Sequence, residues 1–151
     1  EYILPLDIDN LLMPGSLEMF EETCSKGFIA YSNTTKFTDD GYVGKGYFPE
    51  YNPRTLWYRN IMENCSMYKR EWWQEIGGYD ESRELTTYED WEFWMRMALA
   101  GHYGRKIDDV LFKYRVHPDS RNHVAQGDHK RLVDYIRRKN EGYLETIDSR
   151  L

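Results

Sequence analysis

The chain has 151 residues, a length typical of a single domain with its own buried core. With 40% hydrophobic and 30% charged residues, the composition excludes an intrinsically disordered protein. The net charge of −6 argues against a protein that binds nucleic acid by neutralising phosphates, so no nucleic-acid partner is expected.

Apolar periodicity and turn residues predict strands and helices in mixed order, which is typical of the α/β class. In chain order we expect a strand at 2–6, a helix at 15–25, a strand at 28–32, a loop or hairpin at 33–53 and a short helix at 54–62. The second half continues with a strand at 65–68, a helical turn at 71–76, a helix at 90–100, a strand at 110–116 and a charged helix at 128–147.

The three longer helices have apolar stripes that predict their buried faces. These residues are Leu17, Phe20 and Cys24 in the first, Trp91, Trp94, Met95, Ala98 and Leu99 in the second, and Leu132, Ile136, Tyr143 and Ile147 in the last. Thr87-x-x-Asp90 fits a capping box at the start of the second helix.

The two cysteines, Cys24 and Cys65, are far apart and have no metal-binding spacing. They are expected to be buried free thiols of a reducing compartment, with a disulfide as the alternative. No apolar stretch approaches the ~20 residues of a transmembrane helix, and we expect a cytoplasmic protein.

An acidic motif follows the first strand in "YILPLDIDNLLMPG". Side chains alternate along an extended chain, so Asp7 and Asp9 would point to the same side if the strand geometry persists. Two carboxylates at the end of a strand can form a hard oxygen site for Mg²⁺ or Mn²⁺. The alternative is a polar turn in which Asp and Asn serve as loop formers.

Two chemistries place Asp-x-Asp after an apolar strand. "LDIDNLL" resembles the motif of haloacid-dehalogenase-like phosphatases, in which the first Asp attacks phosphorus, and Asp108-Asp109 could imitate the later acidic pair of that family. However, Leu11 stands where that family prefers Thr or Val. The other chemistry is sugar transfer from a nucleotide-sugar, where a divalent ion stabilises the charge of the leaving diphosphate.

Four segments in order favour sugar transfer. They are "YILPLDIDNLLMPGSLE", "MYKREWWQEIGGYDES", "YEDWEFWMRMALAG" and "VLFKYRVHPDSR". Together they resemble family 2 glycosyltransferases of the GT-A fold, from Tyr2 to about Asn122. The resemblance implies a partial GT-A fold with a mixed sheet flanked by helices, and an inverting, metal-dependent glycosyltransferase acting in polysaccharide or glycolipid assembly.

The resemblance also implies roles for individual residues. Asp7 and Asp9 would bind the donor, with Asp9 a ligand of Mn²⁺ or Mg²⁺ and His117 a second metal ligand. Asp90 would be the general base, supported by Glu89. The acceptor would lie against Gly78, Tyr79, Asp80 and Trp91, within or beside the turn 77–81, although the position of Trp91 on the apolar stripe also favours a core role.

The chain departs from the family because the nucleotide-binding βαβ half is absent and Asn10 stands where many relatives carry Asp. We therefore expect a piece of a larger enzyme that is inactive alone. The predicted division is 1–125 for the acceptor-side half and 126–151 for the charged helix.

The predicted partners are a nucleotide-sugar donor, with UDP as the expected nucleotide, and a saccharide or glycolipid acceptor. A homo-oligomer through an exposed sheet edge is a further expectation. The non-enzymatic alternative is an interaction module whose basic helix contacts a partner or the inner face of a membrane. That helix carries Lys130, Arg131, Arg137, Arg138 and Lys139.

Overall fold

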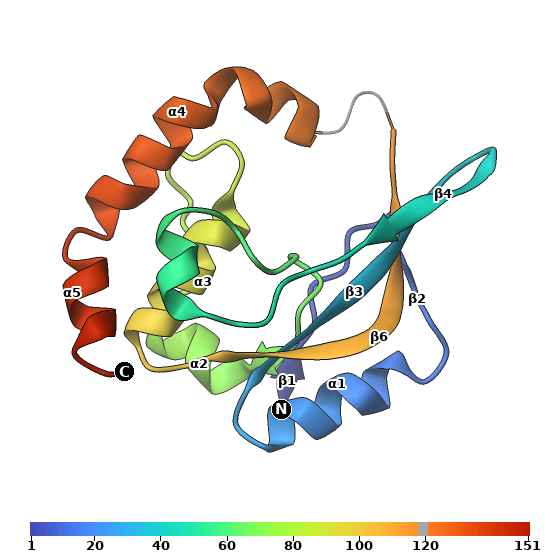
Figure 1. The fold of residues 1–151 in the computed structure, drawn as a ribbon, viewed down its shortest axis with the longest axis horizontal. Helices are drawn as coiled ribbons and strands as arrows, with labels where there is room; N and C mark the ends of the chain where they lie inside the picture. The colour runs from blue at the N-terminus through green and yellow to red at the C-terminus, as the bar shows by residue number, and fades with distance from the viewer. Residues whose placement is uncertain (118–120) are drawn as a thin grey trace.

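The computed structural model describes residues 1–117 and 121–151, with the backbone alone for residues 121–126. It is a mixed α/β structure (Figure 1), as the sequence predicts. Its strands are β1 (Tyr2–Ile3), β2 (Leu11–Leu12), β3 (Ile29–Thr38), β4 (Gly41–Gly46), β5 (Tyr68–Lys69) and β6 (Gly104–Arg115). Its helices are α1 (Ser16–Ser25), the 3₁₀ helix η1 (Pro53–Trp57), α2 (Arg70–Glu75), α3 (Glu89–Leu99), α4 (Arg121–Lys139) and α5 (Tyr143–Asp148).

The main sheet has the order β2-β6-β3-β4 and is mixed, because β3 and β6 run parallel while β2 and β4 pair antiparallel at the two edges. The short strands β1 and β5 form a separate antiparallel pair. An isolated bridge between Ala30 and Met67 connects this pair to β3. The N-terminal segment therefore lies beside the centre of the sheet.

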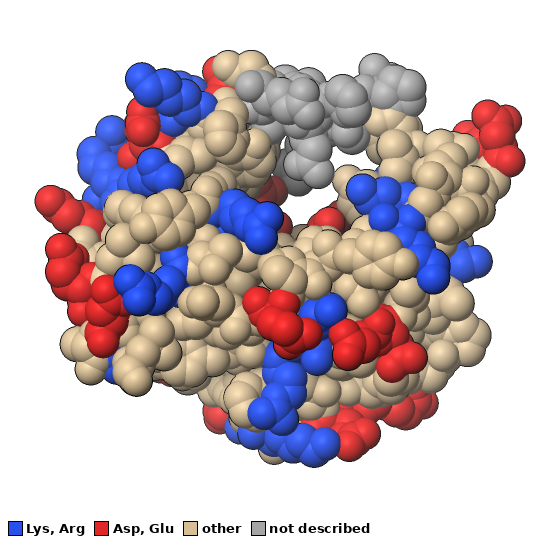
Figure 2. Space-filling model, in the orientation of Figure 1, with Lys and Arg blue, Asp and Glu red and all other residues tan. Residues whose placement is uncertain are grey.

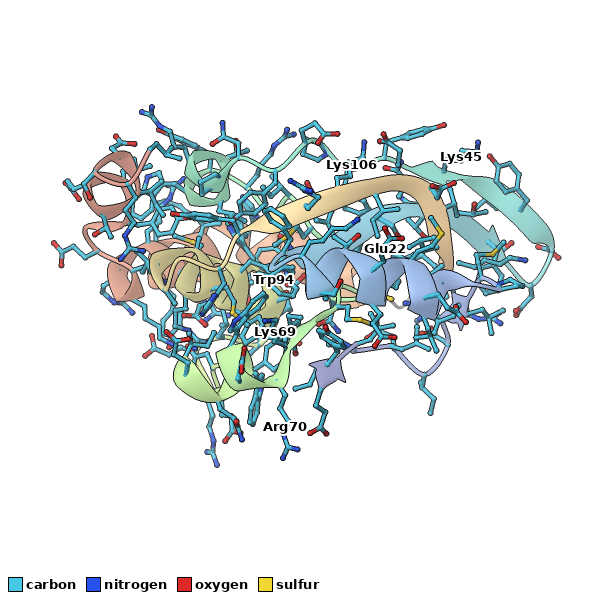
Figure 3. The ribbon with its side chains drawn as sticks, turned by 90° about the horizontal axis from the view of Figure 1, so that it is seen from below. Glu22, Lys45, Lys69, Arg70, Trp94 and Lys106 are labelled. Carbon is cyan, nitrogen blue, oxygen red and sulfur yellow. The ribbon has the colours of Figure 1, made fainter. Side chains whose placement is uncertain are left out.

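Side chains of β3 alternate between two cores, as the period of a strand requires. Ile29 and Tyr31 belong to the larger core, which contains residues of α3, α4, α5 and η1. Ala30 belongs to a smaller core with Phe20 and Cys24 of α1. Seen from below, α1 lies in front of the sheet, and Trp94 lies in the dense layer of side chains of the helical part (Figure 3). Helices thus cover both sides of β3.

The predicted strand at 2–6 is too long, since only Tyr2–Ile3 pairs. Pro5 has no N–H to donate, which disfavours continuing a ladder through it. The strands expected at 28–32 and 110–116 are instead too short. They extend into polar sequence because β3 and β6 pair with each other in parallel along nearly their whole length.

The region expected as a loop or hairpin is a hairpin of β3 and β4. The helix expected at 54–62 is only the short η1, which Asn52 caps by accepting a hydrogen bond from Arg54 N. Leu17 is 52% exposed, so that part of the predicted stripe of α1 is wrong. Both cysteines are free and buried, as predicted.

The helix expected at 128–147 is two helices, α4 and α5, because Gly142 adopts a φ of 79° and ends the regular geometry. The four predicted stripe residues are nevertheless buried: Leu132, Ile136, Tyr143 and Ile147. The predicted division of the chain at 125/126 stays a prediction. Among the described residues, no helix combines the length and apolar character that a membrane span requires.

Several basic side chains of α4 are bound to the body of the protein. Lys139 Nζ lies 2.8 Å from Asp80 Oδ2 and 3.2 Å from Glu92 Oε1. Arg138 pairs with Glu84 at 3.2 Å, and Arg137 lies over the ring of Trp57. Much of the positive charge of α4 is therefore neutralised within the chain.

Candidate active site

The acidic motif is a turn anchored to the end of β6. Asn10 N donates to Asp7 O at 3.0 Å, and the chain turns at Ile8 and Asp9. The extended geometry that would align Asp7 and Asp9 on one side therefore does not persist. Asn10 is buried, and its Oδ1 accepts a hydrogen bond of 3.0 Å from the backbone N–H of Arg115.

This anchor brings His117, two residues beyond the end of β6, next to the turn. His117 Nε2 lies 3.3 Å from Asp9 Oδ2, and both side chains are partly exposed to solvent. An imidazole nitrogen and a carboxylate oxygen form a donor set that suits Mn²⁺, and Mg²⁺ is commonly held by one or two carboxylates with the rest of its shell from phosphate and water. Across the described residues there is no group of three or more His, Cys, Asp or Glu that could hold a metal, so the pair fits an ion only if a ligand completes its coordination.

The second acidic group begins α3. Asp90 is half-buried, and each of its carboxylate oxygens accepts one hydrogen bond, from Trp91 N to Oδ1 and from Asn60 Nδ2 to Oδ2, both at 2.8 Å. Burial raises the pKa of Asp90 to about 6, although these two donors favour its ionised form. Such a carboxylate is ionised at neutral pH and still basic enough to accept a proton.

The start of α3 does not have the predicted capping box. The N-cap is Tyr88, with φ 67°, the only positive φ of a non-glycine residue in the described ranges, and it makes no side-chain cap. Thr87 Oγ1 is buried without a hydrogen-bond partner. A left-handed tyrosine costs about 1–2 kcal/mol, so tertiary contacts, rather than local capping, fix the position of the helix start.

Glu63 connects the two acidic groups, and sequence reasoning missed it. Burial, with the negative charges of Asp90 and Asp7, raises the pKa of Glu63 to about 7, while Lys36 opposes the rise. Because Coulomb interactions weaken with distance, a carboxyl group that feels both charges lies near both. Glu63 lies in "NIMEN", between a predicted helix and a predicted strand. The available signal in the sequence was an acidic residue with an asparagine on either side of it, Asn60 and Asn64.

The asparagines of this segment contact the acidic residues directly. Asn60 donates to Asp90, as described, and Asn64 Nδ2 makes a long contact of 3.5 Å with Asp7 Oδ1. Asn64 Oδ1 also accepts from the hydroxyl of Tyr79 at 3.2 Å. Residues 60–64, which we call the bridging segment, therefore reach from one acidic group to the other.

The predicted acceptor residues occupy different environments. Tyr79 stacks on Phe93 with 4.4 Å between ring centroids, and its hydroxyl faces the bridging segment. Gly78, next to it, has a φ of 75°, and a Cβ there would lie 2.8 Å from Trp73 Cζ2. The turn therefore requires glycine at this position.

Two of these residues are held by other parts of the protein. Asp80 turns to α4, where it accepts hydrogen bonds from Tyr135 and Lys139. Burial opposes ionisation of Asp80, but these donors and the N–H of Ser82 outweigh it, and its pKa is lowered. Trp91 is 3% exposed, and its Nε1 donates to Leu56 O at 2.6 Å, so it is a core residue in this structure.

The acidic pair of the phosphatase reading lies elsewhere. Asp108 and Asp109 are exposed at an irregularity in the pairing of β6 with β3, and Asp108 pairs with Lys106 at 2.8 Å. Asn10 contacts Arg115, seven residues further along the strand from Asp108. At about 3.3 Å per residue, the two acidic pairs are on the order of 20 Å apart.

The front face of the molecule is hollowed near its centre, between the helical part and the β3–β4 hairpin, and acidic side chains are visible in the hollow (Figure 2).

Comparison with protein-family models found no match for the chain, and a search of curated proteins found no significant one.

Proposed function

We propose that the chain carries the site of an inverting, divalent-metal-dependent glycosyltransferase. The site would transfer a sugar from a nucleotide-diphospho-sugar, with UDP as the nucleotide, to a hydroxyl of a saccharide or glycolipid. The observation that carries the proposal is the bridging segment, in which Asn60 binds Asp90 and Asn64 contacts Asp7. It supports one site built from two acidic groups that are about 80 residues apart in sequence.

Asp90 is the general base of this proposal. An acceptor hydroxyl is a weak nucleophile near neutral pH, and a carboxylate within hydrogen-bond reach can take its proton as the oxygen attacks the anomeric carbon. The raised pKa of Asp90, about 6, supports this role, since proton transfer is most efficient when the base has a pKa near the working pH. Attack opposite the leaving diphosphate inverts the configuration, through a transition state with oxocarbenium character.

Asp9 and His117 are the residues that would hold the divalent ion. The ion would supply positive charge to the leaving diphosphate, and the diphosphate would complete the coordination shell. Asp7, on the same turn and in contact with Asn64, would orient the donor. The mixed sheet, with the acidic turn beside β6, is compatible with the GT-A fold that we propose for the chain.

The phosphatase alternative has less support. It requires a second acidic pair near Asp7, but Asp108 is paired with Lys106 in the middle of β6. The same lysine also lies 3.5 Å from Glu50, which gives it a local structural role.

Calorimetric titration of Mn²⁺, with and without UDP, tests the proposal on the wild type and on Asp9→Ala, His117→Ala and Asp108→Ala. We expect UDP to tighten Mn²⁺ binding, and Asp9→Ala and His117→Ala to weaken it by at least ~10–100-fold, the range seen when support of a metal ligand is removed. Asp108→Ala is the matched control and should bind like the wild type. Mn²⁺ binding that does not change with UDP and is lost in Asp108→Ala would favour the phosphatase. A wild type that binds neither Mn²⁺ nor UDP would contradict the proposal.

A further inference from the structure

The bridging segment carries an inference that rests on the proposed function and adds a residue to it. We propose that Asn60 is a positioning residue that keeps the carboxylate of Asp90 ionised and fixes its orientation toward the acceptor hydroxyl.

The hydrogen bonds of Asn60 determine which way its amide points. Its Oδ1 accepts from Met62 N at 3.3 Å, so its Nδ2 is the group that faces Asp90 Oδ2 at 2.8 Å. An amide held at both ends cannot offer its oxygen to Asp90 without losing both bonds. Asn60 therefore presents a donor, which favours the carboxylate over the carboxylic acid.

The second donor on Asp90 completes the orientation. Trp91 N binds Oδ1 at 2.8 Å, so the two oxygens are tied to two different segments of the chain, α3 and the bridging segment. A carboxylate with both oxygens held in this way cannot rotate freely. Each oxygen retains a lone pair that can accept a proton from a substrate.

The other groups around Asp90 make this donor necessary. Glu89 on α3 and Glu63 on the bridging segment are acids whose negative charge disfavours a second carboxylate. Tyr79 and Tyr88, from the neighbouring turns, are phenols whose pKa the charge of Asp90 helps to raise. None of these four groups brings positive charge. The ionised form is stabilised by the side chain of Asn60 and by the backbone N–H groups of Trp91 and of Asp90 itself, so Asn60 supplies the side-chain donor.

Asn60→Asp is the most direct test, because it keeps the shape of the side chain and removes the donor. NMR titration of the Asp90 carboxyl, assigned with Asp90→Asn, should show the pKa rising from about 6 to about 7 or above, since a hydrogen bond to a charged group is worth about one unit of pKa. Asn60→Ala should give the same direction without the added charge, and Asn60→Gln should restore part of the effect. Asn52→Asp is the matched control, since Asp serves equally well as the cap of η1.

An unchanged Asp90 pKa in folded Asn60→Asp and Asn60→Ala would overturn the inference, whatever the function of the site. The proposed function is tested separately, by Mn²⁺ titration with and without UDP. If the wild type shows no UDP-enhanced Mn²⁺ binding, the proposed function fails, while the NMR titration still decides the role of Asn60.

Discussion

The two acidic groups of the site differ in what surrounds them. The turn at Asp7 and Asp9 is solvent-exposed or nearly so, and one buried asparagine, Asn10, anchors it. Asp90 is half-buried at the start of α3, and Glu92 of the same helix forms ion pairs with Arg96 and Lys139. An exposed pair suits a ligand that brings its own charge, whereas a half-buried carboxylate with a raised pKa suits proton transfer. The contrast matches the separate roles that sugar transfer requires.

The position of α3, which carries Asp90, depends most on Glu92, a fully buried residue of the same helix. Its carboxylate binds Arg96 at 2.7 Å and Lys139 at 3.2 Å, and Arg96 also donates to Ile76 O next to the Gly77-Gly78 turn. Glu92→Gln removes the buried negative charge that Arg96 and Lys139 share, and leaves Arg96 without its acidic partner while Lys139 keeps Asp80. We expect the free energy of unfolding to fall by about 3–5 kcal/mol in urea titrations.

Arg138→Ala provides the control for that loss. Its pair with Glu84 is largely exposed on both sides, so its removal should cost at most ~0.5 kcal/mol. Equal losses in the two variants would mean that α3 is not held by its buried ion pair, and the contrast between the two acidic groups would lose its structural basis.

The exposed turn that carries Asp7 and Asp9 is held in place by Asn10. Asn10→Ala removes the acceptor of Arg115 N and the donor to Asp7 Oδ2, and leaves a buried N–H unsatisfied. We expect a loss of about 1–3 kcal/mol in the free energy of unfolding and weaker Mn²⁺ binding, because the turn no longer holds Asp9 beside His117. Full stability with unchanged Mn²⁺ affinity would show that the turn is fixed by other contacts.

The raised pKa of Glu63 makes the stability of the protein depend on pH. Its pKa is raised from 4.5 to about 7, so between these values the folded state binds more protons than the unfolded state. Stability therefore decreases as pH rises from about 4.5 to 7, and the full penalty remains above pH 7. Glu63→Gln should be more stable than the wild type by roughly 1–2 kcal/mol at pH 8, discounted for partial exposure, and should match it near pH 4. Thermal unfolding across this range measures the difference, and a constant offset at every pH would contradict the assignment.

Much of the fold could be predicted because its signals are local. The apolar stripe of α3 and the glycines after α1 and α2 indicate their elements without tertiary information. The extent of β3 and β6 could not be predicted, because their polar residues are strand only through pairing with each other. The start of α3 was predicted with the wrong cap, since packing holds Tyr88 in a conformation that its own propensity disfavours.

The sequence predicts the main carboxylates of the candidate site, but it does not predict the residues that contact them. Asp9 and His117 were paired by resemblance, and the structure brings them to 3.3 Å. Asn60, Glu63 and Asn64 were missed because nothing in their local sequence says that two distant carboxylates meet there. Asp80 was expected beside the acceptor, but its partner Lys139 lies 59 residues away in the chain, at a separation that sequence patterns do not report.

The central claim is that Asp7 and Asp90 share one site through Glu63, and the carboxyl pKa of Glu63 measures it directly. NMR titration should give a value of about 7 in the wild type, a lower value in both Asp7→Asn and Asp90→Asn, and no change in Asp108→Asn. A pKa near 4.5 in the wild type, or a value that responds to only one of the two aspartates, would contradict a single site.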